Sequence, residues 1–438
     1  MDLLIPSLVV LVNPLHNCFR KEVFEMFRLM IGAWIVCLGR RSISRIWETT
    51  GKVEERNRAA AFRPFSEAVW DWDEVCHSLI CSLLVHLVPV MNIWVAIDDT
   101  LCHKRGAKVA FGGIFLDAVL SSKQKKIFRF GNSWVMAGIA VKLPFRERYF
   151  CLPVLWRIYK KKGVGDGEHR TKSQLAAEMI RQLAQWFPER KILVVGDSAY
   201  IGKHLLKDRP KNVEVIGPTR WDACLTKPLD AQHSSRRKKG ERLPTPAQML
   251  KDDKNYPAEE IELDFGACQR RLEVKVIKNI CWYQAGGSEA VQLILIRDPA
   301  GKWRNEVLLS TNLDLTAKEI IEGYCRRWSI EVAFRDAKQL LGFHDPQVWC
   351  EKSVERAAPM SWFVGSLIVL WYTTEGHAGT QAHRQRPWYQ NKPEPTFADM
   401  LAACRIQLWQ HWLTEECGSE AELEEQLNWL LTYMATSD

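Results

Sequence analysis

The chain has 438 residues, of which 47% are hydrophobic and 26% charged, and these values exclude a disordered, collagen-like or coiled-coil protein. The length predicts more than one domain and a large buried core. Lysine and arginine number 60 against 52 acidic residues, so the net charge of +8 is compatible with a nucleic-acid partner without requiring one.

Cysteine usage and the apolar stretches both bear on location. The 13 cysteines include no C-x-x-C pair, which disfavours a disulfide framework or structural zinc site and indicates a reduced, cytoplasmic or nucleoid-associated protein. Prolines interrupt the apolar stretches 79–97 and 357–374, so we expect core helices rather than membrane spans. The start, MDLLIPSLVVLV, has no basic residue, which disfavours a signal peptide.

Residues 1–90 carry mostly helical patterning. Apolar residues recur at helical spacing over Glu22–Leu38, and the basic segment that holds Arg40, Arg41 and Arg45 is typical of a turn followed by a short helix. A basic helix after a turn could enter DNA, as in helix-turn-helix units, although ordinary helical bundles show the same pattern. We interpret residues 1–90 as a helical DNA-binding domain.

Strand patterning begins at residue 92. Four segments rich in β-branched and aromatic residues are predicted strands: Asn92–Ile97, Val109–Val119, Ser133–Lys142 and Tyr149–Trp156. A helix that starts with a capping box is predicted over Thr171–Phe187, and a buried strand over Lys191–Val195. Strands followed by helix–strand alternation favour an α/β domain with a mixed sheet, which we place at residues 91–217.

Residues 218–304 interrupt this alternation and predict a β-rich insertion. Three stretches of alternating hydrophobicity account for it: Glu259–Phe265, Arg271–Ile277 and Val291–Ile296. We place the second part of the α/β domain at residues 305–378. The remaining residues, 379–438, predict a helical tail that is acidic and has no basic residue after Arg405. This tail could form a dimer contact or a regulatory element, or pack on its own chain.

Two aspartates follow the ends of predicted strands. Asp98 comes after the run that begins at residue 92, and Asp197 after the one that begins at residue 191. Carboxylates at the ends of strands in one sheet are held rigidly and could share a metal ion, but an aspartate there often only begins a turn. Asp99 is adjacent to Asp98, and alternation along a strand sends the two side chains to opposite faces.

A polar stripe follows on the next long helical pattern. One helix is predicted over residues 317–341, with Thr316 and Glu319 spaced as a capping box and Gly342 at the end. Four polar residues stand on it: Tyr324, Arg327, Glu331 and Lys338. At about 100° per residue their offsets of 3, 7 and 14 place all four within about 60° of one another. Apolar flanks point this stripe towards protein, although ion pairs within the helix would give a similar pattern.

The spacing of these four residues resembles a known signature. Y-x2-R-x3-E-x6-K is typical of a group of bacterial insertion-sequence DDE transposases, and VVGDSAY around Asp197 is similar to the second-Asp strand of that family. AIDDTLCHKRG is similar to the first-Asp segment, whose pattern falls here on Asp98, Thr100, Lys104 and Gly106. The resemblance covers about residues 90–375 and implies an RNase H-like mixed sheet in the α/β core.

The resemblance also implies a chemistry. Asp98, Asp197 and Glu331 would be the catalytic and metal-ligating residues, with Asp99 as the alternative first acid. Hard carboxylate oxygens suit Mg²⁺ or Mn²⁺, and we expect two ions. The reaction implied is phosphodiester cleavage in DNA followed by strand transfer.

DNA contacts and partners follow from the same resemblance. The residues expected to hold DNA phosphates are Tyr324, Arg327, Lys338 and Lys104. Trp282 and Trp303 in the insertion are candidates for base stacking, although a core position is the more ordinary role for each. The expected partners are double-stranded DNA, both terminal inverted repeats and target, and a second copy of the chain in a homodimer on DNA. A nuclease without strand transfer and a DNA-binding regulator without catalysis are the alternatives.

Overall fold

The computed structural model describes residues 3–51, 57–88, 91–164, 168–229, 239–264, 269–377, 392, 394–415 and 419–435. The N-terminal region is helical, as predicted. Its elements are α1 (Pro6–Val12), the 3-10 turn η1 (Asn13–Cys18), α2 (Lys21–Val36), α3 (Ile43–Thr49), α4 (Ala59–Ser66) and α5 (Trp72–Leu87). Among the described residues, no helix is long and apolar enough to span a membrane.

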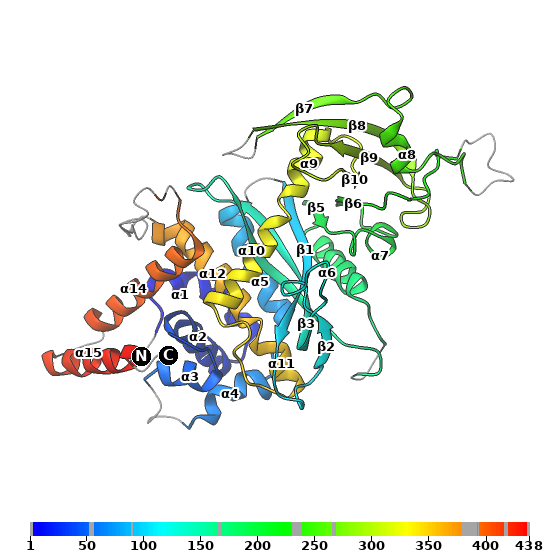
Figure 1. Ribbon diagram of the computed structural model, residues 1–438. Helices are drawn as coiled ribbons and strands as arrows, with labels where there is room; N and C mark the ends of the chain where they lie inside the picture. Colours follow the sequence, from blue (N-terminus) through cyan, green and yellow to red (C-terminus); the bar gives the residue numbers. More distant parts are fainter. Residues whose placement is uncertain are drawn as a thin grey trace.

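In the part of the chain that the structure describes, ten strands form a single mixed sheet, which can be followed in Figure 1. They are β1 (Asn92–His103), β2 (Gly113–Leu116), β3 (Phe128–Lys142), β4 (Tyr149–Tyr159), β5 (Lys191–Gly196), β6 (Val213–Pro218), β7 (Glu259–Asp264), β8 (Gln269–Cys281), β9 (Ala290–Arg297) and β10 (Glu306–Ser310). Their order is β2-β3-β1-β5-β6-β10-β9-β8-β7, with β4 also paired to β3. The antiparallel β4, β3 and β1 followed by parallel β5 and β6 confirm the expected RNase H-like mixed sheet.

The remaining helices cover this sheet and extend to the end of the chain. They are α6 (Lys172–Trp186), α7 (Lys203–Leu206), α8 (Pro246–Lys251), α9 (Ala317–Cys325), α10 (Trp328–Leu340), α11 (Glu351–Ala357), α12 (Met360–Trp371), the π-helical turn η3 (Tyr372–Gly376), α14 (Phe397–Glu415) and α15 (Glu420–Ala435). The predicted capping box that opens α6 is present. Figure 1 shows α6 on one side of β1 and α10 on the other.

The single helix predicted over residues 317–341 is wrong, because the structure divides it into α9 and α10 at Arg326 and Arg327. Both residues keep right-handed helical dihedrals. Backbone hydrogen bonds here join residues three apart, from Arg327 to Tyr324 and from Ile330 to Arg327, which is a tight 3-10 turn. The turn lets α9 pack on β5, β6, β7 and β10 while α10 packs on β1, β3 and β4.

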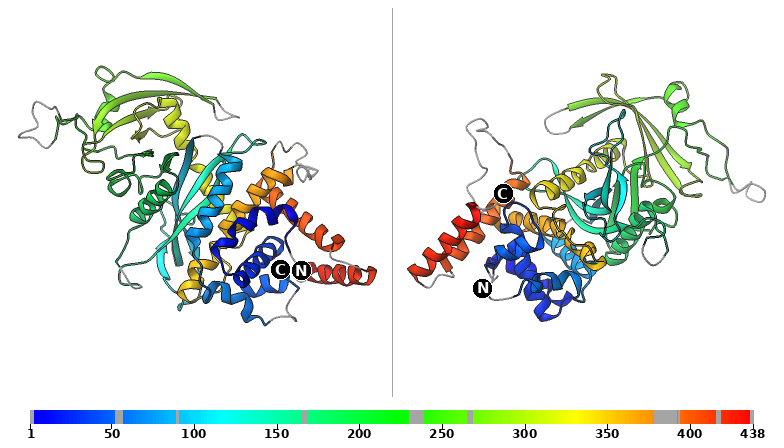
Figure 2. Two further views of the ribbon diagram at one scale, coloured as in Figure 1. Left: turned by 180° about the vertical axis from the view of Figure 1, so that it is seen from behind. Right: turned by 60° about the horizontal axis from the view of Figure 1, so that its bottom comes forward.

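The predicted β-rich insertion does not form a separate sheet. Strands β7, β8 and β9 continue the core sheet through β10, which pairs with β6. Figure 2 shows these strands at the end of the molecule opposite the N-terminal helices. The sheet therefore links the insertion directly to the strands that carry Asp98 and Asp197.

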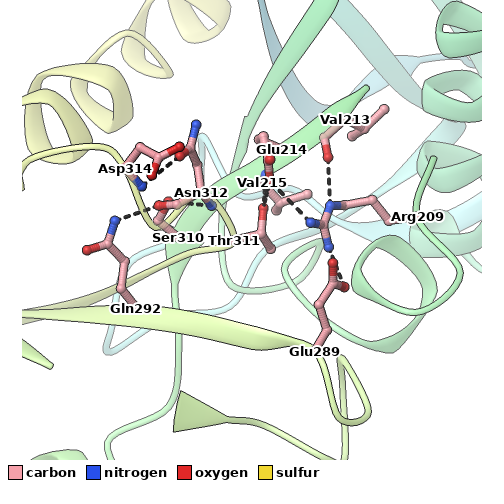
Figure 3. Close-up of polar contacts among 10 residues, drawn as sticks. All are labelled: Arg209, Val213, Glu214, Val215, Glu289, Gln292, Ser310, Thr311, Asn312 and Asp314. Atoms are coloured by element: carbon pink, nitrogen blue, oxygen red, sulfur yellow. Dashed lines mark hydrogen bonds and ion pairs between the residues drawn. The ribbon is translucent and has the colours of Figure 1, made fainter. Parts of the chain in front are cut away.

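A polar cluster anchors this junction (Figure 3). The Arg209 guanidinium, before β6, donates to Glu214 at 3.2 Å, to Glu289 at 2.5 Å and to the Val213 carbonyl at 2.6 Å. Glu214 also accepts from the Thr311 hydroxyl, whose oxygen accepts in turn from the backbone N–H of Val215 at 2.9 Å. Each charged group in this cluster has a partner, so it holds the insertion side of the sheet to the core.

The N-terminal helices pack tightly on the core. The Trp34 indole donates to the carbonyl of Leu341, at the end of α10, and Arg356 donates to the carbonyls of Pro64 and Trp70. Of the predicted DNA-contacting arginines, Arg41 is buried and donates to the carbonyls of two N-terminal residues, Trp34 and Cys37. This role binds Arg41 into the fold, so it has no free charge to offer DNA.

The C-terminal helices close against the same region. Arg405 on α14 donates to the carbonyls of Ile35 and Cys37. Tyr433 on α15 accepts from the backbone N–H of Leu38 at 2.9 Å, and the Arg45 guanidinium lies 4.6 Å from the centre of its ring. The first and last parts of the chain are thus neighbours, as Figure 1 shows.

Candidate active site

Parallel pairing of β1 with β5 brings the two predicted aspartates together. Ile97 on β1 lies opposite Gly196 on β5, so Asp98 and Asp197 follow at the same level of the sheet. Asp197 also begins a turn, because its carboxylate accepts from the backbone N–H of Ala199 at 2.8 Å. The two strands therefore set the spacing between these acids, and the turn fixes the second one.

The N-terminal turn of α10 adds the third acid. Arg327 Nη1 lies 3.1 Å from Asp98 Oδ2 and 3.6 Å from Glu331 Oε1, so one guanidinium bridges the two carboxylates. Asp197 is close enough to act on the charges of both Asp98 and Arg327. The structure thus gathers Asp98, Asp197 and Glu331 around Arg327.

Burial and nearby charges both shift the pKa of Asp98, whose side chain is 13% exposed. Burial raises its pKa to about 7, and the nearby negative charges of Asp197 and Glu331 act in the same direction. The backbone N–H of Asp99 and the Arg327 guanidinium oppose the shift without cancelling it. The cluster therefore holds more negative charge than its own arginine neutralises.

Asp99 points to the other side of β1. Its carboxylate accepts from the Tyr200 hydroxyl at 2.7 Å and pairs with the ammonium of Lys172 on α6. Tyr200 lies three residues after Asp197, in the turn that follows β5. Asp99 therefore ties the strand of the first acid to the loop of the second, while Asp98 faces Glu331. The sequence carried no signal for this tie beyond strand alternation.

The other two residues of the polar stripe lie apart, Tyr324 at the end of α9 and Lys338 near the end of α10. Tyr324 lies near Arg327, Asp197 and Glu306, and burial raises the pKa of its hydroxyl. Burial lowers the pKa of Lys338, which lies near Asp117 and Cys102 at the far end of the helix. Tyr324 and Arg327 thus border the acids. Lys338 lies about 10 Å further along α10, because it follows Glu331 by seven residues and each residue adds about 1.5 Å to a helix.

Three other predicted DNA contacts are placed differently. The buried ammonium of Lys104 donates to the carbonyls of His344 and Pro346, so it braces the loop after α10. Trp282 is buried in the core of the insertion. Trp303 packs against Arg270, whose guanidinium lies 4.3 Å from its ring centre. All three side chains are engaged within the protein.

A separate cavity of about 740 Å³ lies on the opposite face of α10. Its lining includes Trp328 and Val332 of α10, Tyr149 at the start of β4, and Arg326. Arg326 is held between the rings of Trp94 and Tyr149, at 4.0 and 4.5 Å from their centres. The cavity does not contain the acids, so α10 separates it from the candidate active site.

The carboxylates fit a divalent metal by their chemistry. Asp98, Asp197 and Glu331 offer hard oxygen atoms, which Mg²⁺ and Mn²⁺ prefer. In the described part of the chain, however, no group of three or more His, Cys, Asp or Glu side chains is arranged to hold a metal ion. Arg327 is the cation that Asp98 and Glu331 share, so metal ligation requires it to release them.

Two of the three comparisons with known proteins find a match. A family model described as "DDE superfamily endonuclease" matches residues 14–285, which include Asp98 and Asp197 but stop before Glu331. No curated protein matches the chain. A solved structure described as the piggyBac transposase synaptic complex with hairpin DNA aligns with 10% identity and a TM-score of 0.45, over 93% of this chain and 76% of that one.

Proposed function

This chain belongs to the DDE superfamily endonucleases, and from that membership we propose that it is a DNA transposase. It binds the ends of a mobile element, cuts a phosphodiester bond at each end and transfers the freed strand to target DNA. The observation that carries this proposal is the gathering of Asp98, Asp197 and Glu331 around Arg327. A structural role explains this cluster poorly, because repulsion between the buried Asp98 carboxylate and its two partly exposed acidic neighbours costs stability.

The proposed mechanism assigns a role to each side chain at the site. Two Mg²⁺ or Mn²⁺ ions, held by Asp98, Asp197 and Glu331, would supply Lewis-acid activation of the attacking oxygen and charge stabilisation at the leaving oxygen. Arg327 exchanges its carboxylate partners for a phosphate oxygen, since a guanidinium binds either anion through the same donors.

The DNA strand is held on both sides of the scissile bond. The Tyr324 hydroxyl donates to a phosphate oxygen next to Arg327, and Lys338 contacts a phosphate further along α10. Lys104, Trp282 and Trp303 are left out of this assignment because each is engaged within the protein. The partners are two terminal inverted repeats, a target duplex and a second copy of the chain, in the cytoplasm or nucleoid.

The test is cleavage of a labelled duplex that carries the ends of the element encoding this chain. We expect cuts at the end junction with Mg²⁺ or Mn²⁺, none with EDTA, and none with Glu331→Ala. Glu351→Ala, which removes an exposed acid from α11, is the matched control and should cut normally. A target plasmid in the same reaction reports strand transfer.

Other outcomes of that assay assign other functions. Cuts without joined products would make the chain a nuclease that performs no strand transfer. Specific binding without cleavage in either metal would make it a DNA-binding regulator, and the transposase proposal would fail.

A further inference from the structure

Two histidines lie beside Lys338, at the end of α10 that is far from Glu331. His103 ends β1 and His344 follows α10, and their rings stack with centres 4.8 Å apart and planes at 4°. Asp117, just after β2, acts on the charges of both Lys338 and His344. Three elements, β1, β2 and α10, thus converge on one cluster of titratable groups, about 10 Å along α10 from Glu331.

Asp117 orients the ring of His103. Its Oδ2 lies 2.6 Å from His103 Nε2, and its Oδ1 accepts from the backbone N–H groups of Val119 and Leu120 at 3.1 Å each. Burial would raise the pKa of Asp117, but the N–H of Leu120 and the His103 ring hold it below its usual value. Asp117 therefore stays ionised and directs Nε2–H of His103 towards itself.

The opposite nitrogen of His103 is available to a ligand. Its side chain is 40% exposed, and no described residue hydrogen-bonds to its Nδ1. A neutral ring that gives its Nε2 proton to Asp117 presents Nδ1 as an acceptor, whereas a protonated ring presents Nδ1–H as a charged donor. Only the protonated ring can donate Nδ1–H to an anion such as a phosphate.

His344 plays a fixed part in this cluster. Its Nδ1 accepts from the backbone N–H of His103 at 3.0 Å. Burial lowers the pKa of His344 to about 3, and the positive charges of Lys338, His103 and Lys104 add to the shift. His344 is thus a neutral ring near neutral pH, on which the ring of His103 stacks.

We propose that His103 and Lys338 form a second phosphate-binding site for the DNA strand, and that protonation of His103 strengthens it. The proposal rests on the proposed function, since it needs a strand that leaves the acids along α10. Lys338 offers an ammonium group, and Asp117 lies near it and holds the ring of His103, so a phosphate here meets two donors when His103 is charged. His103 is five residues, or about 16 Å, along β1 from Asp98, so this phosphate is not the one that is cut.

The sign of the pH effect follows from the ligand. A phosphate prefers the protonated form of a histidine ring, so a contact to Nδ1 of His103 should make the affinity for DNA fall as the pH rises. The pKa of Asp117 is held below its usual value and that of His344 is about 3, so neither group changes its charge over this range. We expect DNA binding to be about threefold to tenfold tighter at pH 6 than at pH 8.

The experiment measures binding of a short fluorescein-labelled duplex by anisotropy, at both pH values and at several salt concentrations, with EDTA present. Each phosphate that a protein neutralises adds about 0.9 to the slope of log affinity against log salt. The wild-type slope should therefore be steeper at pH 6 than at pH 8, by less than about 0.9. His103→Gln, which can still donate to Asp117, should lose both the pH and the salt difference. His103→Lys should bind equally at both pH values.

His86→Gln is the matched control, because it removes an exposed histidine from α5 and should keep the wild-type pH dependence. A methylphosphonate placed at successive positions of the duplex locates the contact. One methylphosphonate position should abolish the pH dependence of wild-type binding. The same position should not change the binding of His103→Gln, which is expected to show no pH dependence.

Two results would overturn the proposal, and they differ in what else they refute. Wild-type pH dependence in His103→Gln, with DNA still bound, would refute the His103 site alone. Failure of the wild-type chain to bind DNA at any pH would refute the proposed function together with this site.

Discussion

Two clusters of charged residues lie beside the same sheet and differ in their balance of charge. At the junction with the insertion, Arg209 pairs with both Glu214 and Glu289, and Glu214 also accepts from the Thr311 hydroxyl (Figure 3). At the acids, one guanidinium, that of Arg327, serves two carboxylates, and Asp197 adds a third charge. In both clusters one guanidinium serves two carboxylates, but only the acids add a third carboxylate, and that excess negative charge is repulsion that a ligand can relieve.

The largest effect expected is on activity. Asp197→Asn keeps an oxygen that accepts from the N–H of Ala199 but removes the charge, so cleavage should fall by about a thousandfold, or about 4 kcal/mol of barrier, with little loss of stability. The cleavage rate of the labelled duplex and the urea midpoint check both parts. Asp222→Asn, which removes an exposed acid, is the control; an equal loss there would contradict the assignment.

The junction should respond in stability instead. Arg209, whose side chain is 8% exposed, leaves two carboxylates unpaired when replaced, so Arg209→Met should lower the free energy of unfolding by about 3 kcal/mol. Arg220→Met removes an arginine that is 74% exposed and should cost below about 1 kcal/mol. Urea denaturation compares the two. Similar losses of unfolding free energy would show that the Arg209 ion pairs stabilise the fold no more than the exposed ion pair of Arg220 does.

Removing one negative charge from the acids should stabilise the chain. The folded pKa of Asp98 is about 7 against an ordinary 3.8, so ionisation destabilises the fold progressively between about pH 4 and pH 7 and fully above that range. Asp98→Asn should therefore raise the free energy of unfolding by about 2 kcal/mol at pH 8 in EDTA, with no gain below about pH 4. Thermal melts at both pH values measure this gain, and a loss of stability at pH 8 would contradict the destabilisation that burial and neighbouring charge impose on ionised Asp98.

The smallest effect is expected for the hydrogen bond from Tyr200 to Asp99, which joins β1 to the loop after β5. Tyr200→Phe removes the hydroxyl that donates to Asp99, which should cost about 1 kcal/mol of stability and lower the cleavage rate several-fold, since Asp197 is less well placed. Tyr283→Phe in the insertion serves as control. An unchanged cleavage rate in Tyr200→Phe would mean that strand pairing alone positions Asp197.

The two clusters also differ in how far the sequence predicts them. The resemblance to the transposase signature predicts that Asp98, Asp197 and Glu331 converge. Strand patterning alone ends the first strand at Ile97, whereas β1 runs on to His103 and carries Asp98 within it. The pairing of Arg209 with Glu289 joins residues 80 apart, and no local pattern marks either one. The division between α9 and α10 escapes prediction for a related reason, since Arg326 and Arg327 keep helical dihedrals and neither is a glycine or proline.

Chain order has a consequence for synthesis on the ribosome. Asp98 lies on β1 and Asp197 directly follows the adjacent strand β5, but Glu331 comes after the whole insertion, 331 − 197 = 134 residues later. At about 5–20 residues per second, roughly 7–27 seconds separate translation of the second acid from that of the third. A nascent chain that has only the two aspartates cannot complete the site. Translation thus delays nuclease activity until the insertion has been made.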